Sequence, residues 1–305
     1  MSINNMAIKN LSLHFQRVFH SSVSTSARRF DVFMVRFLCG LALLLIAAFV
    51  FYAIPESAPV IRMLDLFDKH LMVLLNYDGG STLDAFWYTF SSKYSTVPLI
   101  LALFYFFFQD RFKWYEMVFF VLSLVVVVAL CDTIASAVIK PYVCRLRPSR
   151  SPMICDLLHF VNGYRSGLYG FVSSHAANAF GVVTYMSLVF RKKIIIFPLV
   201  IWAICICYSR IYLGVHYPGD ILFGSMIGVT IGGLAYYAFR YFYVRVLMKR
   251  YTMNFYTTSA QRNFLVLNIS IFGTIFCILC YSLVINLGTV VKRIKLYNEL
   301  IANVI

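Results

Sequence analysis

The chain alternates between long apolar runs and short polar connections, the pattern of a protein that crosses a membrane repeatedly. A helix rises about 1.5 Å per residue and the hydrocarbon core of a bilayer is about 30 Å thick, so apolar runs of about 20 residues predict spans. We expect seven, at about 32–54, 83–108, 115–139, 176–190, 194–208, 220–244 and 264–287. The predicted fold class is all-α: a polytopic transmembrane helical bundle with a six-span core plus an additional C-terminal span.

The segments around these spans differ in character. Residues 58–75 are apolar with charged positions interspersed, which predicts a helix lying in the membrane interface. Pro98 predicts a bend within the second span. We divide the chain into a basic cytosolic or interfacial N-terminal arm (1–31), the six-span core (32–245), and a basic connector with the seventh span and C-terminal tail (246–305).

The basic residues predict the orientation of the chain. With the N-terminus inside, 15 of the 27 lysines and arginines fall on the cytoplasmic side, as expected for a membrane protein. The loop that begins at Lys140 then faces outward. The 35 residues from His175 to Arg210 allow one short crossing each way, which returns Arg210 to the same surface.

Composition supports a membrane protein and argues against nucleic-acid binding. The chain is 61% hydrophobic and only 13% charged, against about 25% charged residues in soluble domains. Its net charge of +15 comes from short clusters between spans, a pattern that suits anionic lipid headgroups. Cys144 and Cys155 share the outer loop, where a disulfide and two free thiols are both compatible with the sequence.

Three polar stretches carry the candidate chemistry, and the first and third contain basic residues at the ends of spans. Charge near the membrane core is costly, so Lys140, Arg147 and Arg210 are expected to bind an anion. Arginine offers a planar fork to phosphate oxygens, and lysine offers a point charge. The alternative is that these residues anchor helix ends in the interface, which is our interpretation of Arg145, Arg150 and Arg165.

The second stretch, Ser173-Ser174-His175, stands where a span begins. A serine there can cap the helix, and the free N–H groups of a first turn form an anion site. His175 is suited to protonating a departing alkoxide. Taken alone, the tripeptide also fits a capped helix with an incidental histidine.

His216 and Asp220, in the third stretch, can lie on one face of a helix start. Asp220 accepting a hydrogen bond from one imidazole nitrogen would leave the other nitrogen as a nucleophile or base. A zinc site made with His175 is the alternative, but the neighbouring cations would repel the metal.

The spacing of these stretches, Lys140-x6-Arg147-Pro148, Ser173-x-His175 and Ser209-Arg210-x5-His216-x3-Asp220, resembles the type-2 phosphatidic acid phosphatase family of membrane lipid phosphatases, related to vanadium haloperoxidases. The resemblance covers about residues 32–245. It implies that His216 is a nucleophile that forms a phosphohistidine, that Asp220 orients it, and that His175 protonates the leaving group. It also implies that the phosphoryl oxygens are held by Lys140, Arg147, Ser173, the N–H of Ser174, and Arg210, and that neither a metal nor another cofactor is required.

Two features depart from that family. Its usual Pro-Ser-Gly-His reads Val172-Ser-Ser-His175 here, so Ser174 must donate its N–H without the freedom of glycine. The seventh span and its basic tail lie outside the six-span core.

Asp132 is an acid within the third span. It is expected either to support a cation of the site or to hydrogen-bond a neighbouring helix.

The expected function is that of an integral-membrane lipid phosphatase that hydrolyses a phosphomonoester or pyrophosphate. Its site would lie on the extracytoplasmic face of a bacterial-type inner or plasma membrane. The candidate substrates are undecaprenyl diphosphate, lipid A, phosphatidylglycerol phosphate and phosphatidic acid, and the sequence does not choose among them. The alternatives are a lipid-to-lipid phosphotransferase on the same fold and a non-enzymatic lipid-binding or transport protein.

Overall fold

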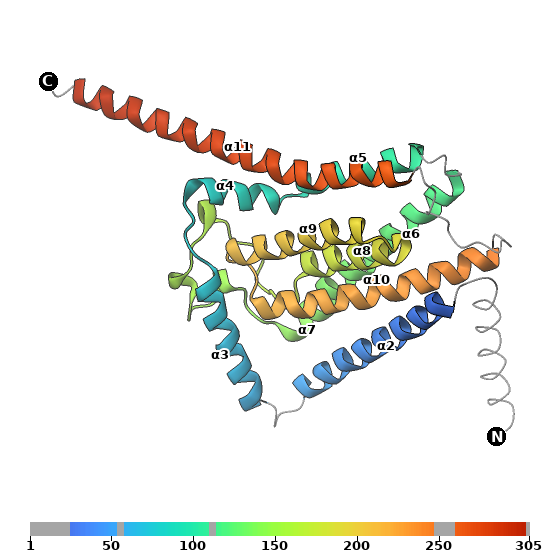
Figure 1. The fold of residues 1–305 in the computed structure, drawn as a ribbon. Helices are drawn as coiled ribbons and strands as arrows, with labels where there is room; N and C mark the ends of the chain where they lie inside the picture. The colour runs from blue at the N-terminus through green and yellow to red at the C-terminus, as the bar shows by residue number, and fades with distance from the viewer. Residues whose placement is uncertain (1–24, 54–57, 110–113, 247–259, 303–305) are drawn as a thin grey trace.

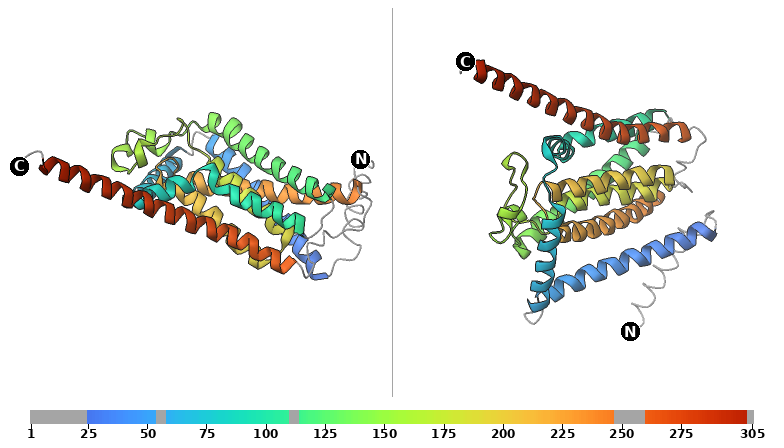
Figure 2. Two further views of the ribbon diagram at one scale, coloured as in Figure 1. Left: turned by 90° about the horizontal axis from the view of Figure 1, so that it is seen from above. Right: turned by 60° about the vertical axis from the view of Figure 1, so that its left-hand side comes forward.

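The computed structural model describes residues 25–53, 58–109, 114–246 and 260–302. Within these ranges the regular elements are helices, and the one isolated β-bridge joins Leu146 to Tyr169. Most helices run side by side as a bundle, while α3 (Ala58–Leu75) lies across one end of it (Figures 1 and 2). The all-α prediction is confirmed.

Three helices form the centre of the bundle: α8 (Ser174–Phe190), α9 (Lys193–Tyr212) and α10 (Pro218–Val246). On one flank, α2 (Thr25–Ala53) packs against α10, and α6 (Trp114–Asp132) packs against α8 and α10. On the other flank, α11 (Ala260–Ala302) packs against α4 (Gly80–Phe90), α5 (Val97–Gln109) and α9. The first residue of α2 and the last of α11 lie at opposite ends of the bundle (Figure 1).

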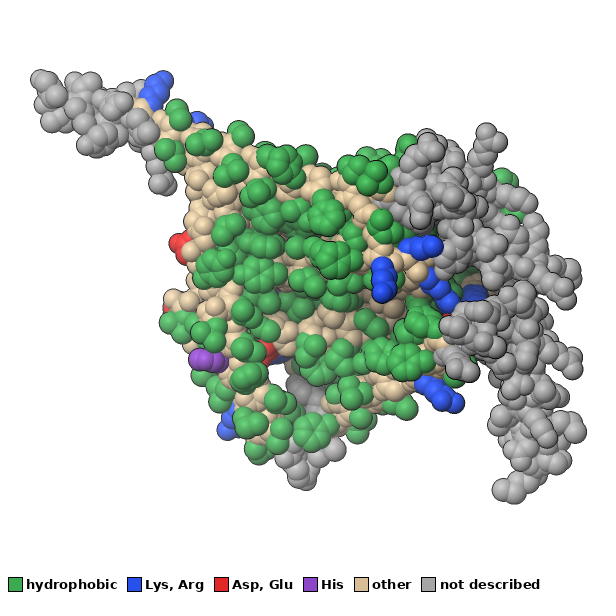
Figure 3. Space-filling model, in the orientation of Figure 1, with side chains coloured by type: hydrophobic (Ala, Val, Ile, Leu, Met, Phe, Trp, Pro, Cys, Tyr) green, Lys and Arg blue, Asp and Glu red, His purple; other side chains and the backbone are tan. Residues whose placement is uncertain are grey.

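Within the described residues, five helices are long and apolar enough to cross a membrane, at Phe30–Phe51, Met117–Val143, Lys193–Tyr212, Pro218–Phe242 and Leu265–Lys292. Hydrophobic side chains cover the flank of the molecule between its two ends (Figure 3). Helix α8 corresponds to the predicted fourth span and is a 17-residue helix enclosed by its neighbours. The chain is an integral membrane protein.

The second predicted span, 83–108, is not a single helix. Helix α4 ends at Phe90, a short 3-10 turn covers Lys93–Thr96, and α5 begins at Val97. The hydroxyl of Ser92 donates to the carbonyl of Thr89 at 2.6 Å, which satisfies a backbone acceptor at the break. Pro98 lies in the first turn of α5, where a missing N–H has no cost. The prediction of one bent helix is therefore wrong.

Helices α8 and α10 meet almost backbone to backbone. A Cβ atom added to Gly224, Gly228 or Gly232 would lie less than 3.0 Å from backbone atoms of residues 173–181. Such glycines at every fourth position allow two helices to approach closely within a membrane. The contact brings the starts of the two helices together, and the N–H of Ser173 donates to the carbonyl of Asp220 at 3.0 Å.

Helix α6 continues through a π-helical segment, Thr133–Ile139, into the short helix α7 (Lys140–Val143). The helix ends at Cys144, which takes the left-handed conformation with φ of 52°. A π-helical insertion changes which side of a helix its later residues face, and such insertions are frequent at functional sites. The loop at residues 144–173, called the outer loop after its predicted orientation, then covers the same end of the bundle as α3 (Figure 1).

Candidate active site

The structure brings the three polar stretches together at the end of the bundle where α8 and α10 begin. Lys140 Nζ lies 3.3 Å from Ser174 Oγ, which joins the first stretch to the second. Arg147 Nη1 lies 2.9 Å from His216 Nε2, which joins the first to the third. Arg210 is held near the end of α9 and hydrogen-bonds the hydroxyl of Ser91, at the break between α4 and α5.

The hydrogen bonds of His216 define its tautomer. A guanidinium group can only donate, so Nε2 accepts from Arg147 and carries a lone pair. Nδ1 therefore carries the proton and faces Asp220 Oδ2 at 3.4 Å. Asp220 Oδ2 also accepts from the backbone N–H of Tyr217 at 3.0 Å. The lone pair of His216 is thus directed toward a basic side chain rather than toward solvent.

His216 is held neutral by its surroundings. The side chain is 1% exposed, and burial is the main cause that lowers its pKa well below the ordinary value. Arg147, Arg210 and Lys140 lower the pKa further, because positive neighbours oppose a second proton. A neutral imidazole with a free lone pair is the form that can act as a nucleophile.

Two arginines of the site are buried without carboxylate partners. Arg147 is 7% exposed and Arg210 is 4% exposed, and within the described chain neither forms an ion pair with Asp or Glu. The Nε atoms of both have no hydrogen-bond partner in the described structure. Burial and the nearby charge of Arg210 lower the pKa of Arg147. An unpaired buried charge is costly, so this arrangement favours binding of an anion.

The start of α8 completes the site. Ser173 is the N-cap, and its hydroxyl accepts from the N–H of Ala176 at 3.4 Å. His175 lies in the first turn and is exposed, and the positive charges of Arg210 and Lys140 are near enough to act on it. The described non-glycine residues with positive φ are Cys144, Asn162 and Arg191. Ser174 is not one of them, so this position does not demand glycine.

The sequence analysis interpreted Arg145 as an interfacial anchor. In the structure its guanidinium instead contacts three aspartates, one of which is Asp220 of the site. Its Nη1 lies 2.9 Å from Asp220 Oδ1 and 2.7 Å from Asp68 Oδ2. Its Nη2 lies 2.7 Å from Asp65 Oδ1. The anchor interpretation is therefore wrong for Arg145, because these acids form ion pairs with its guanidinium. Arg150, by contrast, is exposed.

Sequence reasoning also missed Gly170, in the outer loop. A Cβ atom there would lie 2.9 Å from Asp220 Oδ2 and 3.2 Å from Arg147 Cγ. Only glycine lets the loop backbone approach the acid this closely. A glycine within a long polar loop gave no signal of its own.

A chain of long hydrogen bonds joins Asp132 to the site. Ser136 Oγ donates to Asp132 Oδ1 at 3.4 Å, and Lys140 Nζ donates to Ser136 Oγ at 3.4 Å. Of the two hypotheses for Asp132, this path favours support of a site cation. Cys144 and Cys155 are both free thiols.

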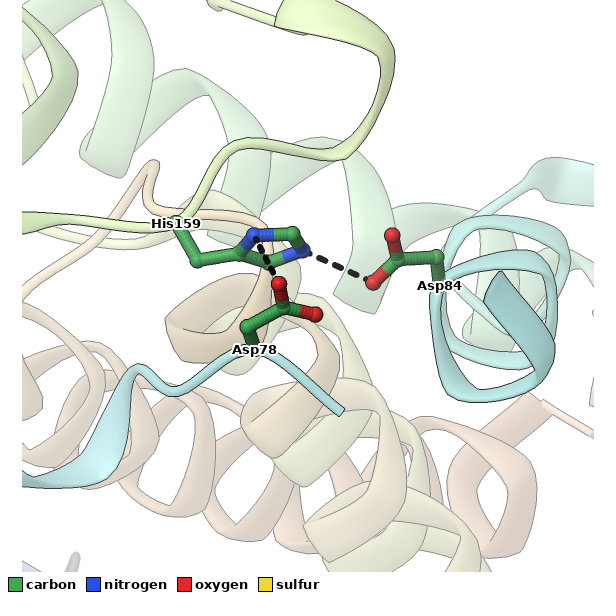
Figure 4. A group of neighbouring side chains, drawn as sticks. All are labelled: Asp78, Asp84 and His159. Atoms are coloured by element: carbon green, nitrogen blue, oxygen red, sulfur yellow. Dashed lines mark hydrogen bonds and ion pairs between the residues drawn. The ribbon is translucent and has the colours of Figure 1, made fainter. Parts of the chain in front are cut away.

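A second polar cluster lies beside the end of α9 (Figure 4). His159 Nε2 is 2.8 Å from Asp84 Oδ1, and His159 Nδ1 is 3.9 Å from Asp78 Oδ2. Each of these three residues offers one possible metal-ligand atom, and the three atoms lie within 4.8 Å of one another. Among the described residues, this is the group of His, Cys, Asp or Glu side chains close enough to hold a metal ion. The two carboxylates, however, approach different ring nitrogens, whereas a metal would bind one. We interpret the cluster as a link between the outer loop and α9, since Tyr212 also donates to Asp84 at 2.7 Å.

Comparison with known proteins gives a family and several relatives. The model of the PAP2 superfamily matches residues 118–243. The chain is 33% identical over 218 residues to a lipid A 4′-phosphatase of Porphyromonas gingivalis, which covers 70% of this chain and 91% of that protein. It is 35% identical over 179 residues to a lipid A 4′-phosphatase of Bacteroides thetaiotaomicron, covering 58% of this chain and 79% of that protein. A crystal structure of a PAP2-type phosphatidylglycerolphosphate phosphatase from Bacillus subtilis aligns with a TM-score of 0.48 and 20% identity, over 70% of this chain and 98% of that one.

Proposed function

Because the chain belongs to the PAP2 superfamily and is an integral-membrane lipid phosphatase, we propose that it removes a phosphate from lipid A. Two relatives that align over most of their own length are named for that activity, at the 4′-position. Undecaprenyl diphosphate is the second candidate, because a stretch of 69 residues of this chain is 36% identical to an undecaprenyl-diphosphatase of Bacillus subtilis.

One observation carries the proposed chemistry: two buried arginines without carboxylate partners lie beside an imidazole whose lone pair points at one of them. Phosphoryl transfer spreads negative charge over three equatorial oxygens, so positioning and electrostatic stabilisation supply most of the catalysis. The cations of this site supply the positive charge that stabilises these oxygens. A phosphate dianion would offset the cost of their burial.

In the first step, His216 Nε2 attacks phosphorus and a P–N bond forms. The bond between phosphorus and the sugar oxygen breaks, and His175 donates a proton to that oxygen as it leaves. Arg147, Arg210, Lys140 and the start of α8 hold the phosphoryl oxygens. The Nδ1–H of the phosphorylated His216 ring then donates to Asp220, and the negative charge of this carboxylate stabilises the positive charge that forms on the ring.

In the second step, water attacks the phosphohistidine. His175, deprotonated by the first step, accepts the proton of this water, the P–N bond breaks, and inorganic phosphate leaves. Both histidines return to their starting forms, so the cycle needs no metal ion. Transfer to a second lipid would use a lipid hydroxyl in place of water.

The site is proposed to face the extracytoplasmic side of a bacterial inner membrane. The distribution of basic residues between the spans supports this orientation. It suits a substrate that leaves its acyl chains in the bilayer while its phosphorylated headgroup enters the site.

Phosphate release from a panel of lipids in detergent tests the proposal. The panel contains bisphosphorylated lipid A, undecaprenyl diphosphate, phosphatidylglycerol phosphate and phosphatidic acid, and mass spectrometry locates the phosphate that is lost. We expect wild type to dephosphorylate lipid A fastest, with no loss of rate in EDTA, and His216→Ala to be correctly folded and inactive.

Three results would count against this assignment. Faster hydrolysis of another lipid would move the substrate to that class. Hydrolysis by His216→Ala at the wild-type rate would exclude the proposed nucleophile. Phosphate that appears on an added acceptor lipid rather than in solution would make the protein a phosphotransferase.

A further inference from the structure

Arg145 connects the proposed catalytic pair to α3, a helix outside the residues matched by the family model. Its guanidinium lies within 3 Å of carboxylates on two elements: Asp220 of α10, and Asp65 and Asp68 of α3. Arg145 Cζ also lies over the ring of Tyr217, 4.0 Å from its centroid. These contacts hold Arg145 in one place behind Asp220.

The two oxygens of Asp220 have different partners. Oδ1 accepts from Arg145, while Oδ2 accepts from the N–H of Tyr217 and faces His216 Nδ1. An interaction that fixes one carboxylate oxygen also fixes the direction of the other. Asp220 is fully buried, so its charge depends on the cation beside it.

We propose that Arg145 is a positioning residue for the reaction: it holds Asp220 ionised and aimed at His216, and Asp68 opposes this effect. The inference rests on the proposed function of His216. Arg145 acts through Asp220 and not through the substrate, because both of its Nη atoms already contact the carboxylates of Asp65, Asp68 and Asp220. Asp68 competes for the same Nη1 atom that binds Asp220.

Other charges around these acids are consistent with this assignment. Arg147 acts on Asp220 from the outer loop, and Lys140 interacts with it from α7. Burial lowers the pKa of Arg145, but Asp220, Asp68 and Asp65 outweigh that effect and raise it above the ordinary value. Burial raises the pKa of Asp68 despite its contacts with Arg145 and the N–H of Gly219. Arg145 therefore stays charged over the whole pH range of an assay.

The first test replaces Arg145 with glutamine and measures kcat, KM and the pH–rate profile on the lipid that wild type hydrolyses. We expect kcat to fall about 10- to 100-fold with little change in KM, as for other groups that orient a reacting residue. Loss of the cation makes protonation of the His216–Asp220 pair easier, so the acid limb should move up by about one pH unit. Arg145→Lys should recover part of kcat. Arg150→Gln, an exposed arginine of the same loop, is the matched control and should behave as wild type.

The second test, Asp68→Asn, should move the acid limb in the opposite direction. The amide oxygen can still accept from the N–H of Gly219, which donates to Asp68 at 2.8 Å, while the competing charge is gone. Arg145 then acts more strongly on Asp220, so protonation of the pair should require a lower pH. A general loss of packing would not produce shifts of opposite sign.

The outcomes separate this inference from the proposed function. If wild type releases no phosphate from any lipid of the panel, the proposed function fails. If wild type is active and Arg145→Gln keeps its kcat and pH profile, Arg145 has no positioning role. A rise in KM with an unchanged pH profile would show that Arg145 binds the phosphate itself. If Arg145→Gln does not fold, Asp68→Asn still tests the inference. An acid limb of Asp68→Asn that is unchanged or shifted to higher pH would contradict it.

Discussion

The charge state of His216, the proposed nucleophile, is expected to set the lower end of the pH range in which this site can work. Its pKa is lowered well below 6.5 by burial and by Arg147, Arg210 and Lys140. The neutral, nucleophilic form therefore persists as the pH falls through 6.5, and is lost only at a more acidic pH. A histidine in open solution would already be half protonated at about pH 6.5.

This argument predicts a shift in the pH–rate profile of Arg147→Gln. Removing a cation that lowers the pKa of His216 should move the acid limb of kcat/KM to higher pH, by about one unit. Titration of the lipid phosphate itself is the same for both enzymes, so the difference between their profiles reports on the site. Arg150→Gln serves as the control, and coincident acid limbs for wild type and Arg147→Gln would contradict the prediction.

At the residue scale, the sequence predicted which residues would meet, because basic residues in two of the three polar stretches at the ends of apolar spans are costly there unless they bind an anion. Their catalytic roles remain predictions, and the structure adds the contacts between them. Arg145 could not be assigned correctly. An arginine at a helix end looks the same whether it faces headgroups or acids, and its partners lie 75 and more residues away.

At the scale of elements, the contact between α8 and α10 determines whether the site assembles. Gly224, Gly228 and Gly232 recur at every fourth position, a signal present in the sequence and not used there. The break between α4 and α5 was not predictable from Pro98 alone. Whether a proline bends one helix or begins another depends on whether nearby hydroxyls, such as those of Ser92 and Ser95, satisfy the carbonyls at the break.

Gly228→Ala should therefore destabilise the protein and reduce its activity. The added methyl group would lie less than 3.0 Å from the backbone of Ala177 and Gly181, so α8 must move away from α10. Overpacking of this kind costs about 1–3 kcal/mol, and it should lower the midpoint of thermal unfolding in detergent.

Gly273→Ala is the matched control, because nothing lies within 4 Å of a Cβ atom at that position of α11. It should be as stable as wild type, or slightly more so, since alanine favours a helix over glycine. Equal stability and activity of the two variants would mean that the close α8–α10 contact is not required.

At the scale of the whole molecule, the site, the outer loop and α3 share one end of the bundle, while α2 begins at the other (Figure 1). The sequence predicted that the loop after Lys140 and the residues around Arg210 share one end, because the 35 residues from His175 to Arg210 allow one short crossing each way. The sequence could not show that α3 supplies acids to the site. An amphipathic segment with interspersed charges predicts an interfacial helix, whether its acids face solvent or other residues of the protein.

Exposed Cys144 in the outer loop offers a direct test of orientation. A membrane-impermeant maleimide added to intact spheroplasts should label the wild type, since we propose that this loop faces outward. Cys144→Ser should lose most of the label, whereas Cys155→Ser should keep it. Labelling that appears only after the membrane is permeabilised would reverse the orientation.

Because α11 ends at the opposite end of the bundle from the start of α2, the two termini are not equivalent places for a fusion partner. A purification tag attached behind α11 would lie at the same end of the bundle as the candidate site, and immobilising the protein by it is expected to crowd the approach to that site. A tag ahead of α2 would hold the protein from its far side and leave the approach clear.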